Sequence, residues 1–212
     1  MKNLILIAPP AAGKGTLSES LVKDFNYTHI STGDLLREKQ NDGTELGNEI
    51  KELMQSGSLV GDDIVTALLK EKLETIEGSF ILDGYPRNLK QADILNNLLN
   101  ELNLNIGKVI YINVSKEVAM ERALGRISCS KCGKIYNKYN PEMTPSVEGI
   151  CDLCGGEIVG RSDDNEESFK VRFDTYVNNT KPLMDYYEEK GLLYITNSST
   201  SKEVFEETKK VI

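Results

Sequence analysis

Three groups of residues in this chain of 212 have types and spacings that could do chemistry. The first is a run of small residues that ends in Gly13-Lys14-Gly15-Thr16. Backbone N–H groups in such a turn, at the start of a helix, bind anions, and a lysine adds a mobile positive charge. The second group is a set of arginines at turns, and the third is two Cys-x-x-Cys pairs. Together the groups predict phosphate ligands and a metal ion.

The first group departs from the general phosphate-loop pattern Gly-x-x-x-x-Gly-Lys-Ser/Thr. Ala8 stands where the first glycine would be, and an extra glycine precedes Thr16. Ala8 is held extended by the following Pro9, a conformation that needs no glycine. A glycine-like φ at Ala11, by contrast, would cost roughly 1–2 kcal/mol. On this loop alone, a nucleotide site and a glycine-rich turn without a ligand both remain open.

The arginines lie at turns and element ends rather than on plain helix faces. Singly, each fits a solvated surface residue, but phosphoryl transfer needs several positive groups in fixed positions and little covalent chemistry from the protein. The only histidine, His29, is expected to be structural rather than a general base. Asp83, at a strand end, could orient magnesium, with a helix N-cap as the alternative. The arginines in question are Arg37, Arg87, Arg122, Arg126, Arg161 and Arg172.

The two Cys-x-x-Cys pairs lie in an atypical segment, residues 126–163, in which no helical period survives. Four thiolates without a histidine nearby form a closed tetrahedral set, which predicts structural zinc. Two disulfides or four free thiols are the alternatives. So short a segment builds little core, and a metal would take its place. Zinc ribbons also occur in nucleic-acid binders, but the acidic chain and the interrupted α/β core favour a structural lid. The ligands are Cys129, Cys132, Cys151 and Cys154.

The remainder of the chain alternates aliphatic strands with amphipathic helices. This pattern predicts an α/β fold with a parallel sheet covered on both faces. Ligands bind such sheets at the carboxyl ends of the strands, where Lys14 and Asp83 both fall. Strands are expected over 4–7, 27–30, 79–83, 108–114 and 192–196. Helices are expected over 17–25, 41–57, 63–73, 89–102, 116–124 and 204–211. A further helix is expected to be capped by Ser31 or Thr32 and to carry Arg37 in its early turns.

Length and charge restrict the class of protein. The chain is long enough for one globular domain with insertions, and its net charge is −8. An acidic surface argues against a general nucleic-acid or membrane-surface binder. There is no run of 18 apolar residues, and the N-terminus has no signal-peptide core. We therefore expect a cytoplasmic protein with neither nucleic acid nor membrane as a partner.

Over essentially its whole length, the chain resembles adenylate kinases of the long bacterial type with a zinc-binding lid. The resemblance rests on five segments. They are Gly13-Lys14-Gly15-Thr16, the segment from Ser31 to Arg37, Phe80-Ile81-Leu82-Asp83-Gly84-Tyr85-Pro86-Arg87 with Gln91-Ala92, Gly125-Arg126, and the segment from Arg161 to Glu167.

The resemblance implies a three-layer P-loop NTPase core with a parallel sheet and two inserts. The core would comprise residues 1–30, 61–125 and 164–212, the AMP-binding helical domain residues 31–60, and the zinc-binding lid residues 126–163. The implied reaction is reversible transfer of a phosphoryl group from Mg-bound ATP to AMP, giving two ADP, by a monomer. Where the family has glycines, this chain has Ala8 and Ala11, and Thr196-Asn197 replaces Asp-Gly.

Site residues follow from the same resemblance. It assigns ATP to Ala11, Ala12, Gly13, Lys14, Gly15, Thr16, Arg122, Arg126, Ile135, Tyr136 and Ser199. It assigns AMP to Thr32, Arg37, Ser58, Leu59, Val60, Gly84, Tyr85, Pro86, Arg87, Gln91, Arg161 and Arg172. The expected catalytic set is Lys14, Asp83, Arg87, Arg126, Arg161 and Arg172. The alternatives are a kinase for another nucleoside monophosphate, and a nucleotide-dependent zinc-ribbon binding protein without turnover.

Overall fold

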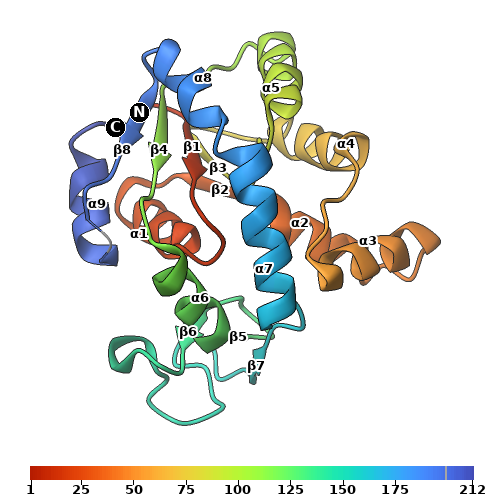
Figure 1. Cartoon of the computed structure of the whole chain (residues 1–212), viewed down its shortest axis with the longest axis vertical. Helices are drawn as coiled ribbons and strands as arrows, with labels where there is room; N and C mark the ends of the chain where they lie inside the picture. Colours follow the sequence, from red (N-terminus) through yellow and green to blue (C-terminus); the bar gives the residue numbers. More distant parts are fainter. Residues whose placement is uncertain (199) are drawn as a thin grey trace.

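The computed structural model describes residues 1–198 and 200–212. Its centre is a parallel five-stranded sheet with the order β2-β3-β1-β4-β8 (Figure 1). The strands are β1 Leu4–Ile7, β2 Thr28–Ser31, β3 Phe80–Asp83, β4 Lys108–Tyr111 and β8 Leu193–Ile195. The predicted parallel α/β sheet is confirmed, with each strand within a few residues of its expected bounds.

The sheet is buried on both faces. Neighbouring residues of a strand point to opposite sides of the sheet, so a central strand contributes to the core on each face. Ile5 and Ile7 of β1 join one hydrophobic cluster, whereas Leu4 and Leu6 join the other. Four consecutive aliphatic residues in β1 are therefore the signature of a strand that is covered on both sides.

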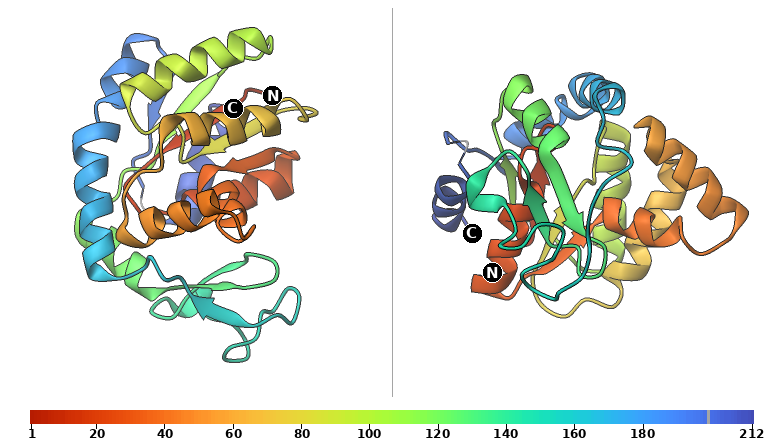
Figure 2. Two further views of the ribbon diagram at one scale, coloured as in Figure 1. Left: turned by 90° about the vertical axis from the view of Figure 1, so that its right-hand side faces the viewer. Right: turned by 90° about the horizontal axis from the view of Figure 1, so that it is seen from below.

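Helices cover the two faces and form a three-layer core (Figure 2). The first cluster lies under α4, α5 and α8, and the second under α1, α6 and α9. These helices are α1 Lys14–Phe25, α4 Asp62–Leu73, α5 Leu89–Glu101, α6 Lys116–Gly125, α8 Leu183–Glu189 and α9 Ser201–Lys209.

Two helices between β2 and α4 form a side unit, α2 Thr32–Lys39 and α3 Glu45–Ser56. Ser31 caps α2 by accepting from the Asp34 N–H over 3.2 Å, as one of the two predicted caps. The α3 helix ends at Gly57, whose φ is 78°. A Cβ on Gly57 would lie 2.9 Å from the Ser168 carbonyl oxygen, so only glycine lets the end of α3 approach the helix that carries Ser168.

The atypical segment forms a small antiparallel sheet with the order β6-β5-β7, here called the lid sheet (Figure 1, bottom). Its strands are β5 Arg126–Cys129, β6 Ile135–Asn137 and β7 Ile158–Gly160, with a 3₁₀ turn, η1, at Pro141–Met143. Three of the described residues, Cys129, Tyr136 and Cys151, form its buried cluster. Lys134 Nζ lies 3.3 Å from Glu19 Oε2 and links the lid sheet to α1.

Residues 164–191 contain elements for which the hydrophobic pattern predicts no bounds. Helix α7, Glu166–Thr175, runs along one side of the molecule from the lid sheet to the core (Figures 1 and 2). It passes into a π-helical turn, η2, at Tyr176–Thr180. Arg172 lies on α7, one helix after Arg161, as expected.

Candidate active site and metal centre

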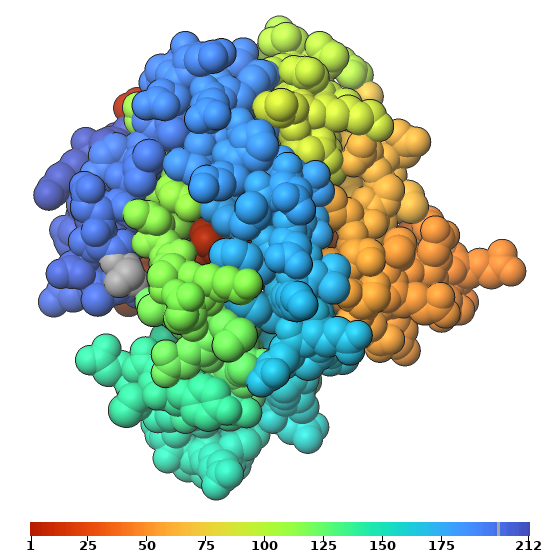
Figure 3. All heavy atoms as spheres, in the orientation of Figure 1, coloured from red at the N-terminus to blue at the C-terminus, as the bar shows by residue number. Residues whose placement is uncertain are grey.

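One cleft of about 1920 Å³ lies between the sheet edge, the α2–α3 unit, the lid sheet and α7. The carboxyl ends of β1 and β3 open into it, as the parallel sheet predicts. Figure 3 shows α7 along the front of the molecule, with the lid sheet below it and the α2–α3 unit at one side. The predicted residues that line this cleft are residues 11–16, Arg37, residues 58–60, Asp83, Gly84, Pro86, Arg87, Arg122, Arg126, Ile135, Tyr136, Arg161 and Arg172.

The loop between β1 and α1 presents a helix N-terminus to this cleft. Gly13, the N-cap of α1, has φ 104° and no side chain that could cap the helix. The first N–H groups of the helix therefore face the cleft without a side-chain cap. Ala11 has φ 58°, a glycine-like value that costs an L-residue roughly 1–2 kcal/mol. Arg122 donates to the Ala12 carbonyl over 3.1 Å and braces the loop from α6. The loop therefore has the shape of an anion site.

Asp83 is the carboxylate nearest to the loop lysine. Lys14 Nζ lies 3.6 Å from Asp83 Oδ1, and His29 Nε2 lies 3.5 Å from Asp83 Oδ2. The N-cap alternative for Asp83 is wrong, because Asn88 caps α5 by accepting from the N–H of its third residue over 2.8 Å. His29 and Lys14 thus approach different oxygens of the Asp83 carboxylate.

Charges around this pair shift both pKa values. Burial lowers the pKa of Lys14, and the attraction of Asp83 opposes that shift. Burial alone would raise the pKa of Asp83, but Lys14, His29 and Arg87 outweigh it and hold that pKa below its usual value. Asp83 is therefore ionised at neutral pH and able to bind a cation.

Two acidic residues hold two of the arginines. The guanidinium of Arg126 donates two hydrogen bonds to Asp164, one of them from Nε to Oδ2 over 2.7 Å. Arg172 Nη1 lies 3.1 Å from Asp163 Oδ2 and 3.4 Å from Asp164 Oδ1. The Asp164 side chain is 3% exposed. A buried carboxylate shared by two guanidinium groups fixes their positions in the cleft.

The surroundings of two other arginines in the cleft oppose their positive charge. Burial, followed by the positive charge of Arg172, lowers the pKa of Arg87 to about 10. Burial, followed by the charge of Arg126, lowers the pKa of Arg161 to about 10. Both groups stay protonated at neutral pH, and an anion bound beside them would relieve the repulsion of Arg87 by Arg172 and of Arg161 by Arg126. The cleft is electrostatically suited to a polyphosphate.

Three predicted residues lie behind the cleft wall instead of on it. Thr32 is buried and donates to the Asp83 carbonyl over 3.3 Å, and the Tyr85 hydroxyl pairs with Thr66 over 3.0 Å. Gln91 Oε1 accepts from the Arg87 N–H over 2.7 Å, and its Nε2 donates to Asp62 over 2.8 Å. In this structure these side chains shape the wall from within. The predicted Ser199 lies outside the described residues.

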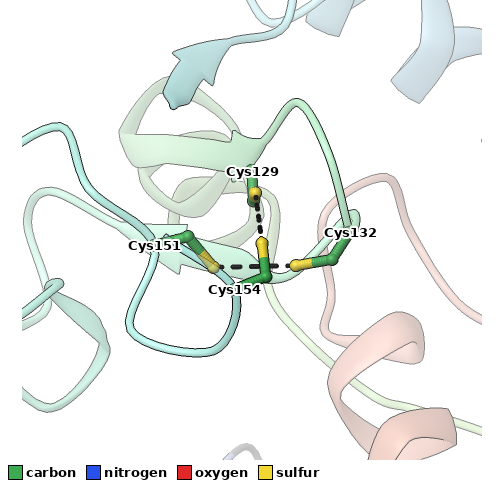
Figure 4. A group of neighbouring side chains, drawn as sticks. All are labelled: Cys129, Cys132, Cys151 and Cys154. Carbon is green, nitrogen blue, oxygen red and sulfur yellow. Dashed lines mark hydrogen bonds between the residues drawn. The ribbon is translucent and has the colours of Figure 1, made fainter. Parts of the chain in front are cut away.

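The four cysteines bring their sulfur atoms together, and all four are free (Figure 4). Their Sγ atoms lie within 4.8 Å of one another, with Cys129–Cys154 at 3.5 Å and Cys132–Cys151 at 3.6 Å. Zinc with Zn–S bonds of about 2.3 Å separates its sulfurs by about 3.8 Å, so the spacing fits one tetrahedral ion. A Cβ on Gly156 would lie 2.9 Å from Cys129 Sγ, so glycine leaves room for the cluster.

Tyr136 joins this cysteine cluster to the cleft. Its hydroxyl donates to Cys151 Sγ over 3.4 Å and accepts from the Asp152 N–H over 2.8 Å. This hydrogen bond lowers the pKa of the Cys151 thiol to about 6, which favours the thiolate that a metal needs. Because the Tyr136 side chain faces the cysteines, its backbone is the part available to a ligand.

Reasoning from the sequence assigned no role to Asp163 or Asp164, although both follow Arg161 in the segment that carries the resemblance. Their signal is two adjacent acidic residues before a helix that bears an arginine.

No helix among the described residues is long and apolar enough to cross a bilayer.

Comparisons with known proteins place the chain in a family. The model of the adenylate kinase family matches residues 6–192. An adenylate kinase of Caldicellulosiruptor bescii is 45% identical over 212 residues, which cover 99% of this chain and 96% of that protein. One of Desulforamulus reducens is 46% identical over 90% of both chains, and one of Staphylococcus aureus is 43% identical over 99% of this chain and 97% of its own. The chain belongs to the adenylate kinase family.

Proposed function

We propose that this chain is an enzyme that transfers the terminal phosphoryl group of Mg-bound ATP to AMP, reversibly, giving two ADP. One observation carries the proposal: five cations of the predicted catalytic set line a single cleft next to the phosphate loop. Two phosphate groups repel each other, and several fixed positive charges let them come into line. The five are Lys14, Arg87, Arg126, Arg161 and Arg172.

The donor side of the proposed site is the loop between β1 and α1. The N–H groups at the start of α1 and the Lys14 ammonium would bind the ATP phosphates, with Arg122 and Arg126 beside them. The backbone at Ile135 and Tyr136 would contact the nucleotide from the lid sheet. Closure of residues 126–163 over ATP would exclude water, which otherwise competes with AMP as the acceptor.

The acceptor side is the α2–α3 unit, proposed as an AMP-binding domain over residues 31–60. Arg37 and Arg87 would bind the AMP phosphate, and residues 58–60, Gly84 and Pro86 would line its nucleoside. Gln91 supports this side by accepting from the Arg87 N–H over 2.7 Å. We expect function as a monomer, as the resemblance to the family implies.

Both metal ions have residues that suit them. Mg²⁺ prefers oxygen ligands, keeps several waters and binds substrate phosphates with one or two carboxylates, and Asp83 is ionised beside the phosphate loop. When bound, Mg²⁺ neutralises charge on the phosphates. The four cysteines would hold a structural zinc that stabilises the lid sheet. No general base is needed, because the AMP phosphate is itself an anionic nucleophile.

The test is ADP formation from ATP, Mg²⁺ and AMP, run beside CMP, UMP and GMP. We expect AMP-selective turnover by the wild-type chain and a kcat roughly 100- to 1000-fold lower for Lys14→Ala. The matched control is Lys51→Ala, because Lys51 is exposed on α3.

Turnover with another monophosphate in place of AMP would transfer the proposal to that substrate. ATP binding without any turnover would overturn it in favour of a nucleotide-dependent binding protein. An equal loss of turnover in the Lys51→Ala control would remove the assigned role of Lys14.

A further inference from the structure

The π-turn η2 interrupts the helical path that begins with α7. Its defining hydrogen bond runs from the Lys181 N–H to the Tyr176 carbonyl over 2.9 Å. Turns of this kind are rare and are frequently found at functional sites. Here the turn follows the helix that carries Arg172, which lines the cleft, and Thr180 is the last residue of the turn.

Both ends of this turn are tied to other parts of the core. At its start, the hydroxyls of Tyr176 and Tyr111 lie 2.6 Å apart in a buried contact, which joins the turn to the carboxyl end of β4. At its end, the Thr180 hydroxyl donates to the Arg87 carbonyl over 2.8 Å, across 93 residues of chain. The turn therefore sets where Arg87 lies relative to the sheet and α7.

Arg87 is restrained at three points. Its N–H donates to Gln91 Oε1 over 2.7 Å, and its side-chain Nε donates to the Gly84 carbonyl over 2.7 Å. Both of these partners belong to the same short stretch of chain as Arg87. The bond from Thr180 comes from a distant segment, so it resists movement of the stretch as a whole.

The electrostatics explain why such a restraint matters. Burial and the charge of Arg172 both oppose the charged form of Arg87, as its lowered pKa indicates. In the absence of an anion, repulsion therefore favours movement of Arg87 away from Arg172. A hydrogen bond to the Arg87 backbone, made from the helix path that also carries Arg172, opposes this separation.

We propose that Thr180 is a positioning residue for the AMP side of the cleft, which it serves by holding the Arg87 peptide opposite Arg172. The proposal rests on the proposed function, because the position of Arg87 matters only if its guanidinium binds phosphate. Thr180 does not take part in the chemistry.

The test compares Thr180→Val, which keeps the shape and removes the hydroxyl, with Thr180→Ser, which keeps the hydroxyl. We expect Thr180→Val to raise the KM for AMP about fivefold to tenfold, the factor that corresponds to one hydrogen bond. The KM for ATP should stay within about twofold of wild type, and Thr180→Ser should restore the KM for AMP. AMP binding by calorimetry should follow the same order. Thr180→Ala, which adds no bulk, repeats the test should valine disturb the turn.

Thr208→Val is the matched control. The Thr208 hydroxyl is buried and donates to the Val204 carbonyl over 2.7 Å within α9. Loss of this hydroxyl should change the thermal midpoint of unfolding, but it should not raise the KM for AMP relative to the KM for ATP. In a double-mutant cycle, Thr180→Val should weaken AMP binding far less in an Arg87→Lys background than in wild type.

An unchanged KM for AMP in both Thr180→Val and Thr180→Ala would overturn the proposal, and so would equal shifts in both KM values. Failure of Thr180→Ser to restore AMP binding, or full additivity with Arg87→Lys, would also overturn it. If the wild-type chain shows no turnover, the proposed function fails. If it turns over normally and the Val variant does too, only the role of Thr180 fails.

Discussion

Ala11 is a residue with a side chain at a backbone angle that favours glycine. Its φ of 58° lies in the left-handed region, in the phosphate loop. The Ala12 N–H donates to the Pro9 carbonyl over 3.3 Å and closes the loop around this residue. An L-residue in this conformation costs roughly 1–2 kcal/mol, and Gly13 is left to supply the second left-handed position without strain.

We expect Ala11→Gly to raise the free energy of unfolding by up to about 1 kcal/mol, because the strain goes and part of the gain is lost to chain entropy. The kcat/KM for ATP should change by less than about threefold, since the loop already has the required shape. Urea unfolding and steady-state kinetics measure the two effects. Asn26→Gly is the control, since Asn26 has φ 56° at the end of α1. A large gain in kcat/KM for ATP would mean that Ala11 impairs the site.

Asp164 is the second residue with a specific expected effect. Asp164→Asn should lower the free energy of unfolding by about 3 kcal/mol, because it leaves the buried Arg126 without its charged partner. Turnover should fall as well, since Arg126 and Arg172 both lose a fixed position. Chemical denaturation and initial rates check both, with Asp185→Asn on the exposed face of α8 as control. Equal effects of the two variants would contradict the role of Asp164.

The sequence predicts which arginines line the cleft better than it predicts how each side chain points. Arg87, Arg126, Arg161 and Arg172 stand at turns or near element ends, and the fold brings them together in the cleft. For Gln91 the predicted AMP contact is a buried hydrogen bond to Asp62 in this structure. Such a direction depends on the packing of α4 against α5, which local residue patterns do not encode.

At the scale of elements, the strands and most helices follow from local pattern, and α7 does not. A strand buried on both faces has a continuous aliphatic run, as β1 does. Phe169 and Phe173 of α7 pack against the core, but Ser168 is buried beside them and Arg172 faces the cleft, so the apolar stripe of the helix is narrow. Helix α7 bridges the core, the lid sheet and the end of α3, so polar contacts accompany a narrow apolar face that a search for a full hydrophobic period misses.

The lid sheet should depend on the proposed zinc more than on its own packing, because its buried cluster is small. We expect the purified chain to contain one equivalent of zinc. Strong chelation should make residues 126–163 sensitive to protease while the helical circular dichroism of the core remains. Turnover should fall in parallel and return when zinc is restored.

Cys132→Ser should reproduce the effect of chelation, and Ser130→Ala in the same turn is its control. Sensitivity to reductant with indifference to chelator would instead support two disulfides, and indifference to both would support four free thiols.

Across the whole molecule, an acidic protein surrounds a basic cleft. The chain has 33 acidic and 25 basic side chains, yet all the cations of the predicted catalytic set line one cavity, together with Arg37 and Arg122. Composition correctly describes the surface as a whole but averages out a local concentration of charge. The cluster becomes visible only once β1, β3, the lid sheet and α7 are placed around the same space.

This cluster should lower the stability of the ligand-free chain. The pKa of Arg161 is lowered to about 10 by burial and by Arg126, so its charge opposes folding at neutral pH. After discounting for solvent at the cleft, we expect Arg161→Met to raise the free energy of unfolding by about 1 kcal/mol and to reduce turnover. Chemical denaturation without and with ATP and AMP measures the change in the free energy of unfolding, and initial rates measure the loss of turnover. A variant less stable than wild type without nucleotide would contradict it.

The contact between Lys134 and Glu19 gives the proposed lid motion a dependence on ionic strength. Both side chains are roughly 40% exposed, so dissolved salt screens their attraction. With rising salt, the lid sheet would spend less time against α1, and products would be released sooner. Where release limits the rate, turnover would then respond to the salt content of the surrounding fluid, a response that Glu19→Gln would remove.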